Sequence, residues 1–148
     1  MDVQPDLDMR ILSKPHCISA VKSAIEAMAL AMGMKENDGA DTALAVHEAL
    51  ANVIKHGYGN KPDQPIQIRV SYQTYQGRKA IQVVIEDESN QINLNEIKSR
   101  SLEEVRPGGL GVHIIQRIMD QVEYSHRGTG SGLRLTISKF IDPHPPRE

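Results

Sequence analysis

The chain has 148 residues, about the length of one ordinary domain, and a net charge of -2 from 17 basic and 19 acidic residues spread along it. This charge pattern argues against direct binding of nucleic acid, and an aromatic content of 3% leaves few side chains for base stacking. The sequence has no run of about 20 apolar residues and a single cysteine, Cys17, which excludes a membrane span and an internal disulfide and predicts a cytoplasmic protein.

The first third of the chain predicts a strand followed by a helix. Apolar and polar residues alternate over residues 7–11, as in a half-buried strand, and Pro15 ends this pattern. Apolar residues then recur at helical spacing over residues 18–32, and Gly33 is positioned to end the helix in the left-handed conformation.

A second helix is predicted over the alanine-rich stretch 39–59, with Asn37 or Asp38 as its N-cap. Three of its polar residues are three or four positions apart and therefore share one helix face: Glu48, Asn52 and Lys55. A carboxylate beside an amide oxygen can hold a hydrated magnesium ion and activate a hydroxyl, whereas the alternative is an ordinary polar pair on a helix surface.

A hairpin follows the second helix. Residues 65–75 and 80–87 alternate between apolar and polar side chains, and Gln76 and Gly77 provide the turn between them. The next polar stretch, residues 88–107, is about twenty residues long, which is typical of a lid or another functional loop.

The last third predicts a helix and a second hairpin. Residues 112–120 carry an apolar stripe at helical spacing. Residues 121–127 and 133–140 alternate as strands, and the glycine-rich stretch 128–132 joins them. We therefore expect one domain over residues 1–148, with an ordered core at about 7–140 and a tail at 141–148.

These elements predict an α/β fold. We expect a two-layer α/β sandwich, in which a mixed, mostly antiparallel sheet carries three helices on one face.

Two further positions could contribute to a binding site. Gly108, Gly109 and Gly111 would let backbone N–H groups at the start of the third helix approach an anion such as phosphate, although a tight turn also explains them. Asp87 ends an apolar run, so its carboxylate could accept a hydrogen bond from an exocyclic amine such as that of adenine, or simply form a turn.

A zinc site is not expected. The segment HEALA resembles the start of a zinc-protease motif, but Ala51 stands four positions after His47, where a second histidine is required. The remaining histidines have no spacing typical of metal ligands.

The order of these clusters resembles the histidine-kinase-like ATPase fold. The stretches GGLGVHIIQRIMDQVEY and LRLTISK look like the corresponding region of the anti-sigma-factor serine kinases, and HEALANVIKHGYG is similar to their magnesium-binding helix. The resemblance extends from about Leu7 to Lys139, nearly the whole chain.

The resemblance implies roles for the residues of the second helix. Glu48 would be the general base that accepts the proton of a substrate serine. Asn52 would hold Mg²⁺ bridging the phosphates of ATP, and Lys55 would contact phosphate.

The resemblance also implies a nucleotide site formed by the sheet and the third helix. Asp87 would accept a hydrogen bond from the adenine amine, with Thr136 on the last strand supporting it. The phosphates would lie at the N-terminus of the third helix, framed by Gly109, Leu110, Gly111 and Val112.

The function implied is that of an ATP-dependent protein-serine kinase and anti-sigma factor. Its partners would be a sigma factor and a small anti-sigma-factor antagonist protein, which it phosphorylates in a partner-switching module. The resemblance is also compatible with a homodimer.

One motif departs from the family pattern. Where the family shows Asp-x-Gly, this chain has Asp87, Glu88 and Ser89, and Ile92 and Asn93 replace a phenylalanine and an aspartate that are common there. This departure motivates an alternative hypothesis, a protein-binding module in which nucleotide binding is weak or lost.

Overall fold

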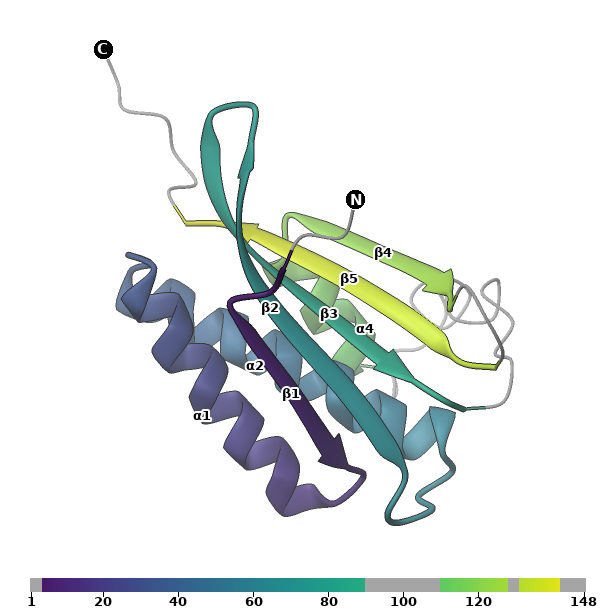
Figure 1. Cartoon of the computed structure of the whole chain (residues 1–148). Coiled ribbons are helices and arrows are strands. Elements are labelled where there is room, and N and C mark those ends of the chain that lie inside the picture. Colours follow the sequence, from purple (N-terminus) through teal and green to yellow (C-terminus); the bar gives the residue numbers. More distant parts are fainter. Residues whose placement is uncertain (1–3, 90–109, 128–130, 142–148) are drawn as a thin grey trace.

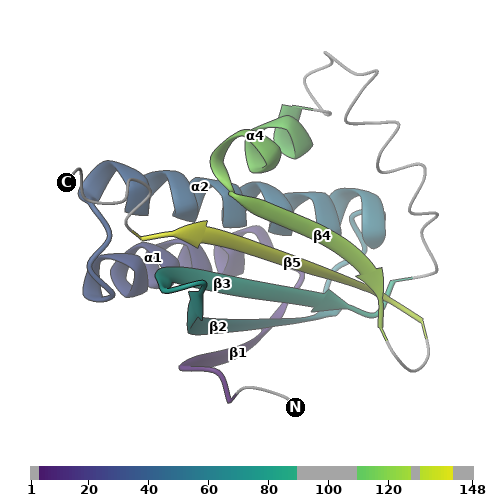
Figure 2. The same ribbon diagram turned by 90° about the horizontal axis from the view of Figure 1, so that it is seen from above.

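The computed structural model describes residues 4–89, 110–127 and 131–141, and these residues form two layers (Figure 1). In chain order the elements are β1 (Leu7–Leu12), α1 (Pro15–Ala31), α2 (Glu36–Asn52), the π-helical turn η1 (Val53–Gly57), β2 (Pro65–Tyr75), β3 (Arg78–Asp87), α4 (Leu110–Ile118), β4 (Gln121–His126) and β5 (Leu133–Phe140). In Figure 1 the helices lie behind the sheet, and Figure 2 shows α2 and α4 together on one side of it. The predicted two-layer α/β fold is confirmed.

The sheet has the strand order β1-β2-β3-β5-β4. All four pairings are antiparallel, so the prediction of a largely antiparallel sheet is confirmed, but the mixed component is not found among the described strands. For two of these pairings, β2–β3 and β4–β5, the physical reason is that only a few residues separate the consecutive strands, too few for the crossover that a parallel pair needs.

The helix ends follow local backbone chemistry. Gly33 follows α1 with φ of +100°, as expected for a left-handed C-terminal glycine. The prediction of Asn37 or Asp38 as N-cap of α2 is wrong, because Lys35 is the N-cap and makes no side-chain capping bond. Glu36 and Asp38 instead lie in the first turn, where their charges interact favourably with the helix dipole.

The core lies between the sheet and the helices. The inward-facing side chains of β2 are Ile66, Ile68 and Val70, all completely buried, as the alternation predicts. Tyr72 continues the pattern in sequence but is 43% exposed, since it lies where the β2–β3 hairpin extends beyond the register that β1 shares with β2.

Two features of this fold position the polar clusters. The end of β3 places Glu86 and Asp87 on opposite faces of the sheet, because side chains alternate along a strand. On the helix side, α2 packs against α4, so that the first turn of α4 lies beside the C-terminal end of α2. Within the described residues, no helix is long and apolar enough to span a membrane.

Candidate functional site

An open cavity lies where α2, η1, α4 and the ends of the central strands meet. It has a volume of about 500 Å³, including its opening to solvent. Its lining residues are Ala49, Asn52, Val53, His56, Gly57, Ile85, Asp87, Val112, Tyr124, Leu133 and Leu135. Most of these are apolar, so the cavity fits a flat, weakly polar group that is recognised by a few polar contacts.

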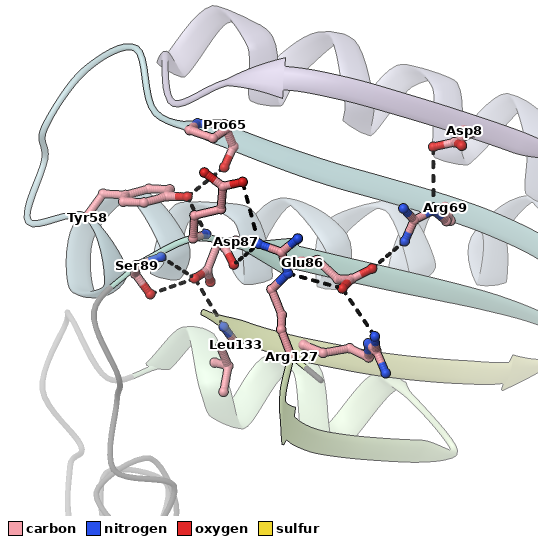
Figure 3. A network of polar contacts seen from close by, with 11 residues as sticks. Asp8, Tyr58, Pro65, Arg69, Glu86, Asp87, Ser89, Arg127 and Leu133 are labelled. Carbon is pink, nitrogen blue, oxygen red and sulfur yellow. Dashed lines mark hydrogen bonds and ion pairs between the residues drawn. The ribbon is translucent and has the colours of Figure 1, made fainter. Parts of the chain in front are cut away.

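Asp87 is the acidic residue of this lining and is only 2% exposed. Its Oδ1 accepts hydrogen bonds from the Ser89 N–H at 2.9 Å, the Ser89 hydroxyl at 2.6 Å and the Leu133 N–H at 3.3 Å (Figure 3). Its Oδ2 lies 3.9 Å from the position that a Cβ on Gly57 would take. Three donors thus fix the carboxylate, and Oδ2 is turned towards a residue of the cavity.

Ser89 does not line the cavity. Its side chain is buried, packs against Gly57 and donates its hydroxyl hydrogen bond to Asp87. The serine that replaces the expected glycine therefore supports the Asp87 carboxylate instead of filling the space where a ligand would bind.

The turn η1 explains which residues of the second helix reach the cavity. After Asn52 the helix widens into one π-helical turn, in which the Tyr58 N–H donates to the Val53 carbonyl at 2.9 Å. Such turns are frequently found at functional sites. His56 and Gly57 line the cavity as a result, whereas Lys55 is exposed and does not line it, so the predicted contact of Lys55 with a ligand does not fit the described cavity.

Tyr58 joins three parts of the site, although no sequence pattern had singled it out. Its hydroxyl donates to the Pro65 carbonyl at 2.6 Å and accepts from the Glu88 N–H at 2.6 Å. Burial raises the pKa of Tyr58, and its hydrogen bond from Glu88 only partly offsets this effect. The neutral hydroxyl thereby ties the end of η1 to the start of β2 and to the segment after β3.

Glu48 and Asn52 lie beside the first turn of α4. A Cβ on Gly111 would be 3.0 Å from Glu48 Oε2 and 3.4 Å from both polar atoms of the Asn52 side chain. Asn52 and Val112 also line the cavity, whereas Glu48 lies one helical turn beyond it. The structure therefore brings Glu48 and Asn52 of α2 together with Gly111 and Val112 of α4, although the two pairs are far apart in the sequence.

These residues fit a magnesium ion that arrives with phosphate. The described residues contain no group of three or more His, Cys, Asp or Glu side chains that could hold a metal ion by itself. Mg²⁺ commonly binds through one or two protein oxygens together with substrate phosphates, and Glu48 and Asn52 offer oxygens next to a glycine that leaves room for an anion.

Thr136 was predicted to support Asp87, but the alternation of side chains along β5 places it on the other face of the sheet. Leu133 and Leu135 line the cavity, so Thr136 points to the opposite face, where its neighbour Arg134 pairs with Glu86 at 3.3 Å. The residue of β5 that contacts Asp87 is Leu133, through its backbone N–H.

Two predicted residues and the predicted lid need separate mention. Leu110 is the first residue of α4, at the helix end that the sequence assigned to phosphate. Gly109 and most of the predicted lid at residues 88–107 lie outside the described residues.

Sequence comparison assigns the chain to a family. The family model described as "Histidine kinase-like ATPase domain" matches residues 11–138 of this chain. Similar proteins named "Serine-protein kinase RsbW" occur in Bacillus pumilus, with 23% identity covering 92% of this chain and 86% of the relative, and in Staphylococcus aureus, with 25% identity covering 91% and 86%. A protein of the same name in Oceanobacillus iheyensis is 24% identical over 91% of this chain and 86% of its own length. The chain therefore belongs to the histidine kinase-like ATPase domain family, and over nearly its whole length it is similar to serine-protein kinases.

Proposed function

We propose that this protein is an ATP-dependent protein-serine kinase that acts as an anti-sigma factor and phosphorylates a small anti-sigma-factor antagonist. The observation that carries the proposal is an apolar cavity with a fixed carboxylate, Asp87, on one side and the Glu48–Asn52 pair against Gly111 on another. The similarity to serine-protein kinases supports the same reaction.

The adenine ring binds in the cavity. Ile85, Val112 and Leu135 offer it apolar contacts, and the fixed Asp87 carboxylate accepts a hydrogen bond from its exocyclic amine. A buried acceptor of this kind discriminates strongly, because a base without the amine would leave it without a partner.

The phosphates lie between α2 and the N-terminus of α4. Gly111 has no side chain to obstruct them, and the backbone N–H groups of this first turn favour an anion. Asn52 and the nucleotide phosphates would together hold Mg²⁺, which neutralises charge on the transferred phosphoryl group.

Glu48 accepts the proton of the substrate serine. The serine oxygen forms a bond to the γ-phosphorus, the bond from that phosphorus to the oxygen of the leaving ADP breaks, and the serine proton passes to Glu48. The Glu48 side chain is 26% exposed, so a serine from another protein can approach it.

The partners belong to the same proposal. The kinase holds the sigma factor when the antagonist is phosphorylated, and it releases the sigma factor when the unphosphorylated antagonist competes for the kinase. Two copies of the chain forming a homodimer would be compatible with this scheme.

The proposal is tested first by nucleotide binding. We expect Mg-ATP to raise the melting temperature of the wild-type protein, since a ligand that binds only the native state stabilises it, and we expect Asn52→Ala to lose most of this rise. Lys55→Ala is the matched control, because Lys55 lies on the neighbouring turn but outside the cavity lining.

The chemical step is tested with a serine-containing antagonist and radiolabelled ATP. Glu48→Gln is expected to retain the ATP-dependent rise in melting temperature and to slow phosphorylation by about a hundredfold or more, the usual effect of losing a general base. An unchanged rate of phosphorylation in Glu48→Gln would show that Glu48 is not the general base.

The binding-module hypothesis remains the second outcome of these tests. It was motivated by Ser89, but this side chain is directed to Asp87 and does not line the cavity. No rise in melting temperature at millimolar Mg-ATP would favour it over the kinase.

A further inference from the structure

One arginine contacts three consecutive residues at the end of β3. Arg127 follows β4, and Figure 3 shows its side chain crossing the end of β3. Its Nη1 lies 3.4 Å from the carbonyl oxygen of Asp87 and 3.6 Å from Glu88 Oε1, and its Nε lies 3.4 Å from Glu86 Oε2. The guanidinium therefore contacts the backbone of Asp87 as well as both neighbouring carboxylates.

The carbonyl of Asp87 needs this donor because the ladder between β3 and β5 ends one residue earlier. The last residues in register are Glu86 and Arg134. The next N–H on β5, that of Leu133, donates to the Asp87 side chain. A buried carbonyl requires a hydrogen-bond partner. Arg127 donates this hydrogen bond to the Asp87 carbonyl in place of an N–H group of the sheet.

Gly132 allows the arginine side chain to reach this position. A Cβ on Gly132 would lie 2.7 Å from Arg127 Cδ and 2.1 Å from the carbonyl oxygen of Asp87, and its φ is +128°. The Arg127 N–H also donates to the Gly132 carbonyl at 3.3 Å. Only glycine permits this close approach of the turn, the arginine and the end of β3.

Glu86 anchors the guanidinium on the other face of the sheet. It is 8% exposed and also pairs with Arg69 and with Arg134, the latter at 3.3 Å. Burial would raise the pKa of Glu86, but the hydrogen bond from Arg69 and the charges of Arg134 and Arg69 outweigh burial and hold it below its ordinary value. The anchor is therefore a charged carboxylate at neutral pH.

We propose that Arg127 is a positioning residue for base recognition: by holding the Asp87 backbone between Glu86 and Glu88, it fixes the Asp87 carboxylate and thereby sets the preference for a base with an exocyclic amine. This role rests on the proposed ATP site. Arg127 is absent from the cavity lining, so it acts through Asp87 and not by touching the nucleotide.

The test compares two nucleotides that differ at the group Asp87 recognises. Inosine triphosphate carries a carbonyl oxygen where ATP carries the exocyclic amine, and both have the same phosphates. The ratio of their dissociation constants, measured by calorimetry with Mg²⁺ on the whole chain, reports how well Asp87 is positioned. A general loss of stability would weaken both nucleotides alike and leave the ratio unchanged.

Arg134→Gln is the matched control for Arg127→Gln. Both arginines pair with Glu86 Oε2 at nearly the same distance, 3.3 and 3.4 Å, but only Arg127 is in contact with the Asp87 carbonyl. Arg127→Gln is expected to reduce the preference for ATP about tenfold, the equivalent of one hydrogen bond to a charged group. Arg134→Gln, which removes a partly exposed ion pair, should change it by about twofold or less.

Arg127→Lys serves if Arg127→Gln does not fold. A lysine keeps the charge beside Glu86, but it has one nitrogen in place of the Nε that contacts Glu86 and the Nη1 that contacts the Asp87 carbonyl, so the preference should still fall. A wild-type preference in both Arg127 variants overturns this role of Arg127 while leaving the ATP site intact. Failure of the wild type to bind either nucleotide overturns the proposed ATP site and this role together. Equal binding of both nucleotides by the wild type overturns the recognition of the amine by Asp87, and with it this role of Arg127, but leaves nucleotide binding intact.

Discussion

Gly111 on α4 lies directly against Glu48 on α2, since a Cβ at Gly111 would come within 3.0 Å of Glu48 Oε2. The two residues are far apart in the sequence, and the packing of α4 on α2 brings them together. This contact makes the first turn of α4 sensitive to a single added methyl group.

Gly111→Ala is expected to lower activity without lowering stability. The new Cβ must displace Glu48 or Asn52, and a misplacement of about 1 Å in a catalytic group can slow a reaction by about a hundredfold. Alanine suits a helix better than glycine, so the free energy of unfolding should stay the same or rise by about 0.4–1 kcal/mol. Phosphorylation assays and urea unfolding measure the two effects.

Gly39→Ala is the control for this variant. Gly39 also lies in a helix, α2, and its added Cβ would meet the Leu30 side chain at 3.3 Å, remote from Glu48. It should leave phosphorylation unchanged. Equal activity in Gly111→Ala and Gly39→Ala would contradict the role assigned to the contact between Gly111 and Glu48.

Gly132→Ala is expected to destabilise the protein by about 2–5 kcal/mol, because backbone strain and overpacking act together. Its Cβ would overlap the Asp87 carbonyl at 2.1 Å, and backbone atoms cannot move aside as a flexible side chain can. Gly59→Ala is the control, since Gly59 has φ of +58° but no heavy atom within 4 Å of its Cβ position. Gly59→Ala should lower the free energy of unfolding, measured in urea, by only the strain of a left-handed alanine, about 1–2 kcal/mol.

Periodicity predicted most of the fold. The alternation of β2 and β3 and the turn at Gln76 and Gly77, with φ of 50° and 78°, are where the sequence placed them. These elements obey local rules: side chains alternate along a strand, and glycine readily adopts positive φ.

The site was less accessible to sequence reasoning because it depends on departures from regular geometry. Helical spacing joined Lys55 to Asn52, but the π-helical turn brings His56 and Gly57 to the cavity instead. Thr136 was selected by resemblance, although the alternation with the buried Leu135 already indicated the opposite face.

Long side chains at strand ends were the least predictable part. Arg127 follows β4 and Gly132 precedes β5, and nothing in the local sequence pattern indicates that the arginine reaches across to β3. The glycine at position 132 was the one signal available in the sequence, since glycine can mark a place where chain segments approach closely, and the structure gives it a positive φ.

Tyr58→Phe is expected to destabilise the protein by about 1–2 kcal/mol at neutral pH, since it removes a hydroxyl with two hydrogen bonds to backbone. Burial raises the pKa of Tyr58 above its ordinary value of 10.0, so its contribution is present below pH 10.0 and is lost as the pH rises through the raised value. The difference between wild type and variant should therefore shrink in alkaline urea titrations.

Tyr72→Phe is the control for Tyr58→Phe. Tyr72 is exposed on the β2–β3 hairpin, and phenylalanine preserves the ring that lies near Lys79. A loss of stability in Tyr72→Phe as large as that in Tyr58→Phe would show that the two backbone hydrogen bonds contribute nothing.

Glu86→Gln should lower stability at neutral pH and change its response to acid. The carboxylate pairs with Arg69, Arg127 and Arg134, so its loss is expected to cost about 1–3 kcal/mol. Burial would raise the pKa of Glu86, but Arg69 and Arg134 hold it below its ordinary value of 4.5. The charged form therefore stabilises the fold above pH 4.5, and this contribution is lost as the pH falls through the lowered value. The difference in free energy of unfolding between wild type and Glu86→Gln should therefore be constant from pH 7 to about 5 and shrink in stronger acid. Glu123→Gln, which removes an exposed carboxylate from β4, is the control and should change the free energy of unfolding at neutral pH by about 0.5 kcal/mol or less. A difference for Glu86→Gln that persists unchanged into strong acid would mean that side-chain packing, and not the charge of Glu86, accounts for its contribution.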